Sequence, residues 1–191
     1  MLESSWTSPS RAVVSATLHQ RRLRGMTLVE ALVVVAILAV LAALTAPAFS
    51  ALLKKQRVDA TSYLLVAHLQ TARSVAVSRN VRTTIAPTDG SHWELGWQVF
   101  TDANRTAKYD DTDELIATAP SSETGISITG SASGQPWVSF AGDGQPKLFN
   151  GGFQAGTFVV CAGADLGTQV IMNRTGRIRL QPAGNACRHT A

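Results

Sequence analysis

The sequence predicts an α+β fold, in which one long N-terminal helix packs on a C-terminal antiparallel β-sheet domain. The first observation behind this prediction is an apolar run that follows Gly25 and contains one charged residue, Glu30, before Pro47. The second is a change of pattern at Val81, after which short extended runs alternate with glycines and prolines. A long helix followed by many short strands is typical of an α+β domain.

Residues 1–25 have no helix or strand pattern and are expected to be a leader that is removed. Translation from a later codon, at Val13, Val14 or Leu18, would leave a shorter leader. Without the leader the chain loses four of its 17 basic residues and one of its 13 acids, so the formal net charge falls from +4 to +1. A nucleic-acid site would therefore have to come from local clustering of charge.

Residues 26–53 are expected to form a transmembrane helix. About 20 apolar residues at ~1.5 Å each match a bilayer core of ~30 Å. Basic residues before this segment, and few charges after it until Lys54, place the N-terminus in the cytoplasm. A carboxylate such as Glu30 is costly inside a membrane. It could lie at the interface, near the positive end of the helix, or neutralise an amine of a neighbouring subunit that cleavage after Gly25 would free.

Residues 54–80 are expected to be the amphipathic half of the same helix. An apolar stripe with helical spacing predicts the face that packs on the globular domain, and the helix is expected to end near Arg79. His68 is expected to be a surface or boundary residue and not a metal ligand, because no second ligand occurs at a metal-binding spacing. The stripe consists of Leu65, Leu69, Ala72 and Ala76.

Residues 81–191 are expected to form a β-rich globular domain. Eight extended runs predict its strands: VRTTIA, HWELGWQVFT, ELIATA, GISITG, PWVSFA, GTFVVCA, TQVIMN and RIRLQ. Large aromatic residues are expected to fill its core. They are Trp93, Trp97, Phe100, Trp137, Phe140, Phe153 and Phe158.

The acidic segment from Asp102 to Glu114 could be a calcium loop or a solvated loop. Ala107 stands where an EF-hand requires glycine, so a solvated loop is expected and no metal site is assigned. The sequence contains no GxSxG, HExxH, P-loop or CxxC motif, and its four histidines form no recognisable constellation. The chain is therefore not expected to be an enzyme or to need a cofactor.

The two cysteines, Cys161 and Cys187, follow the membrane segment and would lie on the side of the membrane opposite the cytoplasm, which is oxidising. A disulfide is expected there. Closing a loop of this length contributes roughly 3 kcal/mol on the chain-entropy model. Two free thiols or a metal pair are the alternatives, with His189 the sole histidine near them.

The C-terminal segment concentrates positive charge, with four arginines and no acid after Asp165. If RIRL is a strand, Arg177 and Arg179 point to one face about 7 Å apart, near the spacing of successive phosphates. Their forked guanidiniums could each bind one phosphate, without base preference because no aromatic residues are interleaved. Two other roles would explain the same residues. They could be solvated charges that keep an edge strand from pairing with other strands, or they could form an interface with the next subunit. The four are Arg174, Arg177, Arg179 and Arg188.

The stretch GMTLVE, followed by the apolar run, resembles the class III signal of type IV pilins and type II secretion pseudopilins. This resemblance implies that a prepilin peptidase cuts between Gly25 and Met26 and N-methylates Met26, and that Glu30 guides filament assembly. It further implies a pilin fold and assembly with other pilins. The chain would cross the inner membrane once, with the globular domain in the periplasm, and would then reach the pilus at the cell surface.

The stretch GWQVFTDAN, with an acidic turn and DELI after it, is similar to the start of the globular domain in the GspH/FimT branch of this family. GRIR fits the GRxR motif of FimT-type minor pilins, which bind DNA in natural transformation. Gly176, Arg177 and Arg179 match that motif, and Arg174 and Arg188 are expected in the same patch. The resemblance implies non-sequence-specific binding of double-stranded DNA. The alternative is a GspH-type minor pseudopilin with a structural or tip role in type II secretion.

Overall fold

The computed structural model describes the backbone of residues 25–189, and the side chains of the same range except residues 43–48 and 189. The chain forms two compact units, Met1–Leu44 and Thr45–Ala191. The leader predicted for residues 1–25 lies outside the described residues apart from Gly25.

Helix α1 spans Leu28–Arg79 and contains 52 residues. Its described side chains before residue 43 are all exposed, among them Leu28, Val29 and Leu38. No helix in the described part of the chain is long and apolar enough to cross a membrane. The transmembrane segment expected over residues 26–53 stays a prediction.

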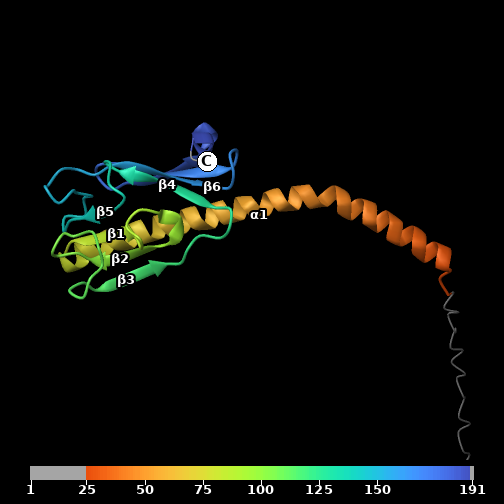
Figure 1. Cartoon of the computed structure of the whole chain (residues 1–191), viewed down its shortest axis with the longest axis horizontal. Helices are drawn as coiled ribbons and strands as arrows, with labels where there is room; N and C mark the ends of the chain where they lie inside the picture. Colours follow the sequence, from red (N-terminus) through yellow and green to blue (C-terminus); the bar gives the residue numbers. More distant parts are fainter. Residues whose placement is uncertain (1–24, 190–191) are drawn as a thin grey trace, which may run out of the picture. The chain divides into compact units, whose positions relative to one another are not determined.

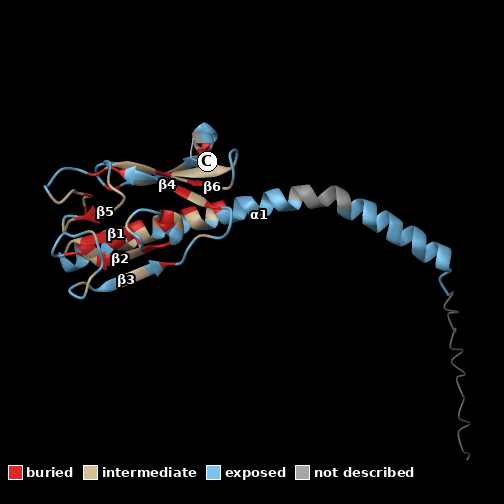
Figure 2. Cartoon of the chain, viewed as in Figure 1, coloured by how far each residue is buried: buried red, intermediate tan, exposed pale blue. Residues whose placement is uncertain are grey.

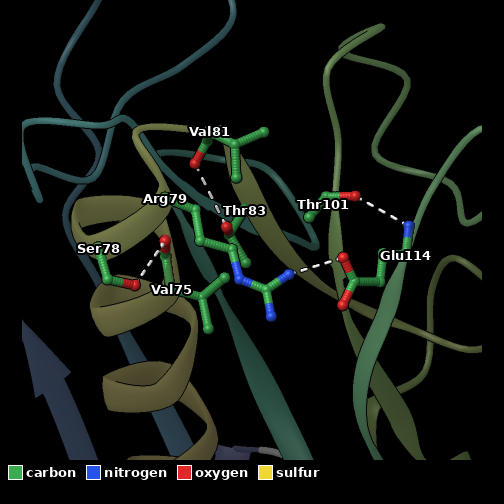
Figure 3. Close-up of polar contacts among 7 residues, drawn as sticks. All are labelled: Val75, Ser78, Arg79, Val81, Thr83, Thr101 and Glu114. Atoms are coloured by element: carbon green, nitrogen blue, oxygen red, sulfur yellow. Dashed lines mark hydrogen bonds and ion pairs between the residues drawn. The ribbon is translucent and has the colours of Figure 1, made fainter.

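The second half of α1 packs on the strands, as Figure 2 shows by burial along this part of the helix. Leu65, Leu69, Ala72 and Ala76 are fully buried, so the predicted stripe is confirmed. The helix ends at Arg79, as expected, and Asn80 follows it with φ 49°. Arg79 donates to Glu114 at 2.6 Å, which ties the end of the helix to the start of the neighbouring strand (Figure 3).

Two antiparallel sheets of four strands each lie against this half of the helix (Figure 1). Every predicted extended run overlaps a strand, and HWELGWQVFT also includes a short 3-10 helix, η1 (Trp93–Leu95). The first sheet has the order β3 (Leu115–Ala119), β2 (Trp97–Thr101), β1 (Thr83–Pro87) and β5 (Val138–Phe140). The second has the order β4 (Ser127–Ala132), β6 (Gly156–Cys161), β7 (Gly167–Met172) and β8 (Ile178–Pro182), followed by η2 (Gly184–His189).

One hydrophobic core is shared by α1 and both sheets. Five of the seven predicted aromatic residues are fully buried in the fold: Trp93, Trp97, Phe100, Phe140 and Phe158. Trp137 is half-buried and stacks on Phe149. The prediction for Phe153 is wrong, because it lies in the loop between β5 and β6 and is 54% exposed.

The acidic segment is only partly solvated. Asp111 and Glu114 are exposed as expected, but Asp102 is completely buried. Its carboxylate accepts hydrogen bonds from the Thr84 hydroxyl at 2.7 Å and from the backbone N–H groups of Thr106 and Ala107. Asp102 therefore holds the loop onto β1. Among the described residues, no group of three or more potential ligands could hold a metal ion.

Candidate nucleic-acid interface

The turn between β7 and β8 is built around the side chain of Asn173. Its Oδ1 accepts hydrogen bonds from the N–H of Thr175 at 3.0 Å and from the N–H of Arg177 at 2.9 Å. The Gly176 N–H donates to the Asn173 carbonyl at 3.0 Å. These bonds fix a compact turn that carries Arg174 at its exposed tip. The tight turn expected at Gly176 is therefore present.

Gly176 has two reasons to be glycine. Its φ of +76° lies in the left-handed region, which side chains rarely adopt. It is also buried, and a Cβ here would lie 3.3 Å from Pro146 Cδ and 3.4 Å from both Gly144 O and Phe140 Cε1. The glycine of the GRIR sequence thus has a structural role in seating the hairpin on the core.

Arg177 and Arg179 are exposed, whereas Ile178 and Leu180 between and after them are half-buried against the core. This alternation is the one expected for a strand, although β8 itself begins at Ile178. Both arginines line one surface hollow of about 330 Å³, which Ile171 also lines. The two arginine side chains therefore lie on the same face of the hairpin, as the sequence predicted.

We call Arg174, Arg177 and Arg179 the hairpin arginines. Their guanidiniums have no hydrogen-bond or ion-pair partner within residues 25–189. Three other arginines of the second unit, in contrast, form ion pairs with carboxylates. Those ion pairs are Arg57 with Glu123 at 2.7 Å, Arg79 with Glu114 at 2.6 Å and Arg188 with Asp165 at 2.9 Å. The hairpin arginines are thus free to bind an external anion.

Arg188 does not lie beside the hairpin arginines, contrary to its predicted position in one patch. It belongs to η2, which follows the far end of β8, and it binds Asp165 in the loop before β7. The hairpin turn is at the opposite end of β8, a strand of five residues that spans about 17 Å. After the turn, β8 leads the chain away from it, so Arg188 lies far from the hairpin arginines although it is close to them in sequence.

The predicted disulfide is confirmed: Cys161 at the end of β6 is bonded to Cys187 in η2, with a Cα–Cα distance of 5.7 Å. Both residues are buried. The bond fastens the segment after β8 to the second sheet. It thereby anchors the end of the strand that carries Arg179.

Arg73 is a residue of this region that the sequence reasoning missed. It lies on α1, is exposed, and donates from Nη1 to the Gly176 carbonyl at 3.3 Å. The contact joins residues 103 positions apart. No sequence signal indicates it, because tertiary packing alone brings this helix face to the hairpin turn.

His68 is half-buried on α1, which agrees with the predicted surface or boundary position. Its Nδ1 accepts a hydrogen bond from Trp97 Nε1 at 2.9 Å. Burial lowers the pKa of His68 below its ordinary value of 6.5. The neutral ring is therefore favoured, and it joins the helix to β2.

At the N-terminal end, Gly25, Met26 and Glu30 are exposed. Thr27 precedes α1, and its Oγ1 accepts a hydrogen bond from the Glu30 N–H at 3.2 Å. This is the bond of a helix N-cap, and Glu30 lies in the first turn, where the helix dipole favours an acid. Within the described residues the Glu30 carboxylate has no partner, so it is free to meet one from another chain.

The family model described as "Type II transport protein GspH" matches residues 63–176, and the model of the prokaryotic N-terminal methylation motif matches residues 20–46. The first match ends at Gly176, just before Arg177. Comparison with curated proteins finds no match.

Among solved structures, the chain is similar to the type IV minor pilin FimU of Pseudomonas aeruginosa, with 19% identity and a TM-score of 0.53 over 67% of this chain and 90% of that one. A second crystal form of FimU gives 20% identity and a TM-score of 0.50 over 65% and 93% of the two chains. The minor pseudopilin EpsH of the Vibrio cholerae type 2 secretion system gives 11% identity and a TM-score of 0.48 over 67% and 98%.

Proposed function

The chain belongs to the GspH family, in the GspH/FimT branch of type IV pilin-like proteins, and from this premise we propose that it is a DNA-binding minor pilin. As a pilin-like protein it assembles with other pilins into a filament. There it binds extracellular double-stranded DNA through the hairpin arginines, without base preference. Filament retraction then draws the DNA inward in natural transformation.

The observation that carries the proposal is the set of three unpartnered guanidiniums on one hairpin. Each guanidinium presents N–H donors in a fork that matches phosphate geometry. Arg177 and Arg179 lie about 7 Å apart along one face, close to the spacing of phosphates along a strand. The chain without its leader has a formal net charge of only +1, so the attraction is local to the hairpin.

The same proposal includes processing at the inner membrane. Prepilin peptidase cleaves after Gly25 and N-methylates Met26, and the exposed apolar half of α1 then lies in the bilayer before assembly. In the filament this helix packs on those of other subunits, because an exposed apolar surface is stabilised by burial. Glu30 would neutralise the new terminal amine of a neighbouring subunit.

A duplex-binding assay on the purified full chain in a non-ionic detergent tests the DNA proposal. The double variant Arg177→Gln with Arg179→Gln should bind at least ten-fold more weakly than the wild type. Arg188→Gln removes one charge at the other end of the hairpin and is the matched control, which should bind like the wild type. Two duplexes of unrelated sequence should bind equally. Equal affinity of wild type and double variant would refute the proposal.

The second candidate is a minor pseudopilin of a type II secretion system, which the description of the matched family favours. In that role the hairpin arginines would contact a neighbouring subunit or an exported protein. Genes beside this one would separate the two functions. Other minor pilin genes would support the pilus, and secretion genes the pseudopilus.

A further inference from the structure

A groove of about 570 Å³ runs between α1 and the hairpin turn. The residues on its helix side recur at the three- and four-residue spacing of a single helix face. Among the residues that the structure describes, no carboxylate lines this groove. The helix side consists of Gln70, Arg73, Ser74, Val77 and Ser78, and the hairpin side of Gly176, Arg177 and Ile178.

The groove offers several hydrogen-bond donors that the protein leaves unused. Arg73 donates one N–H to the Gly176 carbonyl, and a guanidinium has five N–H donors. The Arg177 guanidinium and the Ser74 hydroxyl have no partner within residues 25–189. Two cations and a hydroxyl around an open groove are the chemistry that binds a phosphate.

Arg177 connects this groove to the surface described above. It lines the groove beside α1, and it also lines the hollow that Arg179 shares. Arg73, Arg177 and Arg179 therefore follow one another from the helix to the outer face of the hairpin. A single nucleic-acid strand could pass from one guanidinium to the next.

We propose that the DNA-binding surface extends onto α1, where Arg73 and Ser74 hold a further phosphate of the strand bound by the hairpin arginines. This inference rests on the proposed function, since it adds a contact to the same site. The bond to the Gly176 carbonyl holds the Arg73 side chain across the groove. Because this bond already orders the Arg73 side chain, the side chain loses less conformational entropy when it binds a phosphate.

The salt dependence of duplex affinity tests the assignment in the full chain. Arg73→Gln should weaken binding several-fold and make the negative slope of log K against log salt shallower by about 0.9, the value for one phosphate contact. Arg73→Lys keeps the charge and should restore the slope. A residue that only positioned the turn would leave the slope unchanged. Arg79→Gln, on the same helix but bound to Glu114, is the matched control and should leave affinity and slope unchanged.

A second variant tests the groove without touching Arg73. Ser74→Asp places a carboxylate among the donors and should weaken binding, whereas Ser121→Asp adds the same charge outside the groove and should not. Thermal unfolding confirms that each variant is folded. If Arg177→Gln with Arg179→Gln loses binding but Arg73→Gln and Ser74→Asp bind like their controls, the extension onto α1 is wrong and the hairpin site stands. If the hairpin variant binds like the wild type, both are wrong.

Discussion

Replacing Gly176 with alanine should destabilise the fold more than the same change at Gly151. Both glycines have positive φ, +76° and +90°, so each substitution costs about 1–2 kcal/mol in backbone strain. At Gly151 a Cβ would meet nothing within 4 Å, whereas at Gly176 it would lie tightly against Pro146 Cδ at 3.3 Å and in contact with Gly144 and the buried Phe140 at 3.4 Å. Overpacking of this kind adds about 1–3 kcal/mol. We therefore expect a loss of about 2–5 kcal/mol at Gly176, and of about 1–2 kcal/mol at Gly151.

Thermal unfolding followed by near-ultraviolet circular dichroism measures the two losses, because the buried Trp93 and Trp97 report on the core. For a chain of this size about 1 kcal/mol shifts Tm by about 2–4 °C. Equal shifts for Gly176→Ala and Gly151→Ala would show that the hairpin turn is not seated on the core as described. The structural reason for Gly176 would then be refuted.

Three further predictions concern stability. Reducing the bond between Cys161 and Cys187, 26 residues apart, should lower the free energy of unfolding by about 3–4 kcal/mol; an unchanged Tm after reduction would contradict this. Since burial lowers the pKa of His68, the unfolded chain binds the proton more tightly, and the wild type should lose stability relative to His68→Gln as pH falls below about 6.5. A constant difference between pH 8 and 5 would oppose this. Leu69→Ala should cost about 2–5 kcal/mol and the half-exposed control Leu64→Ala less than about 1 kcal/mol; similar losses would contradict the assigned helix face.

The elements of this fold could be predicted because their signals are local. The stripe that includes Leu65 and Leu69 gives the packed helix face, and the alternation around Ile178 gives the direction of the Arg177 and Arg179 side chains. Turn residues such as Gly176 mark the strand ends. Each of these signals lies within a few residues along the chain, where helix and strand periodicity act.

The features that sequence reasoning missed depend on contacts between distant segments. Arg73 meets the hairpin 103 residues later, and Asp102 is buried by a bond to Thr84 on another strand. Arg188 was grouped with the hairpin arginines because it is close in sequence, but β8 carries the chain to the opposite end of the sheet. Phe153 is exposed because its loop leaves the core. Hydrophobicity alone does not reveal that departure.

The most direct test of the central claim is the slope of log K against log salt for duplex DNA and the full chain. Three hairpin arginines that each neutralise one phosphate predict a slope at least as steep as about −2.7, since each contact contributes about −0.9. In the Arg177→Gln and Arg179→Gln double variant the slope should become shallower by about 1.8. A wild-type slope near zero, or the same slope in both proteins, would contradict DNA capture through these phosphate contacts.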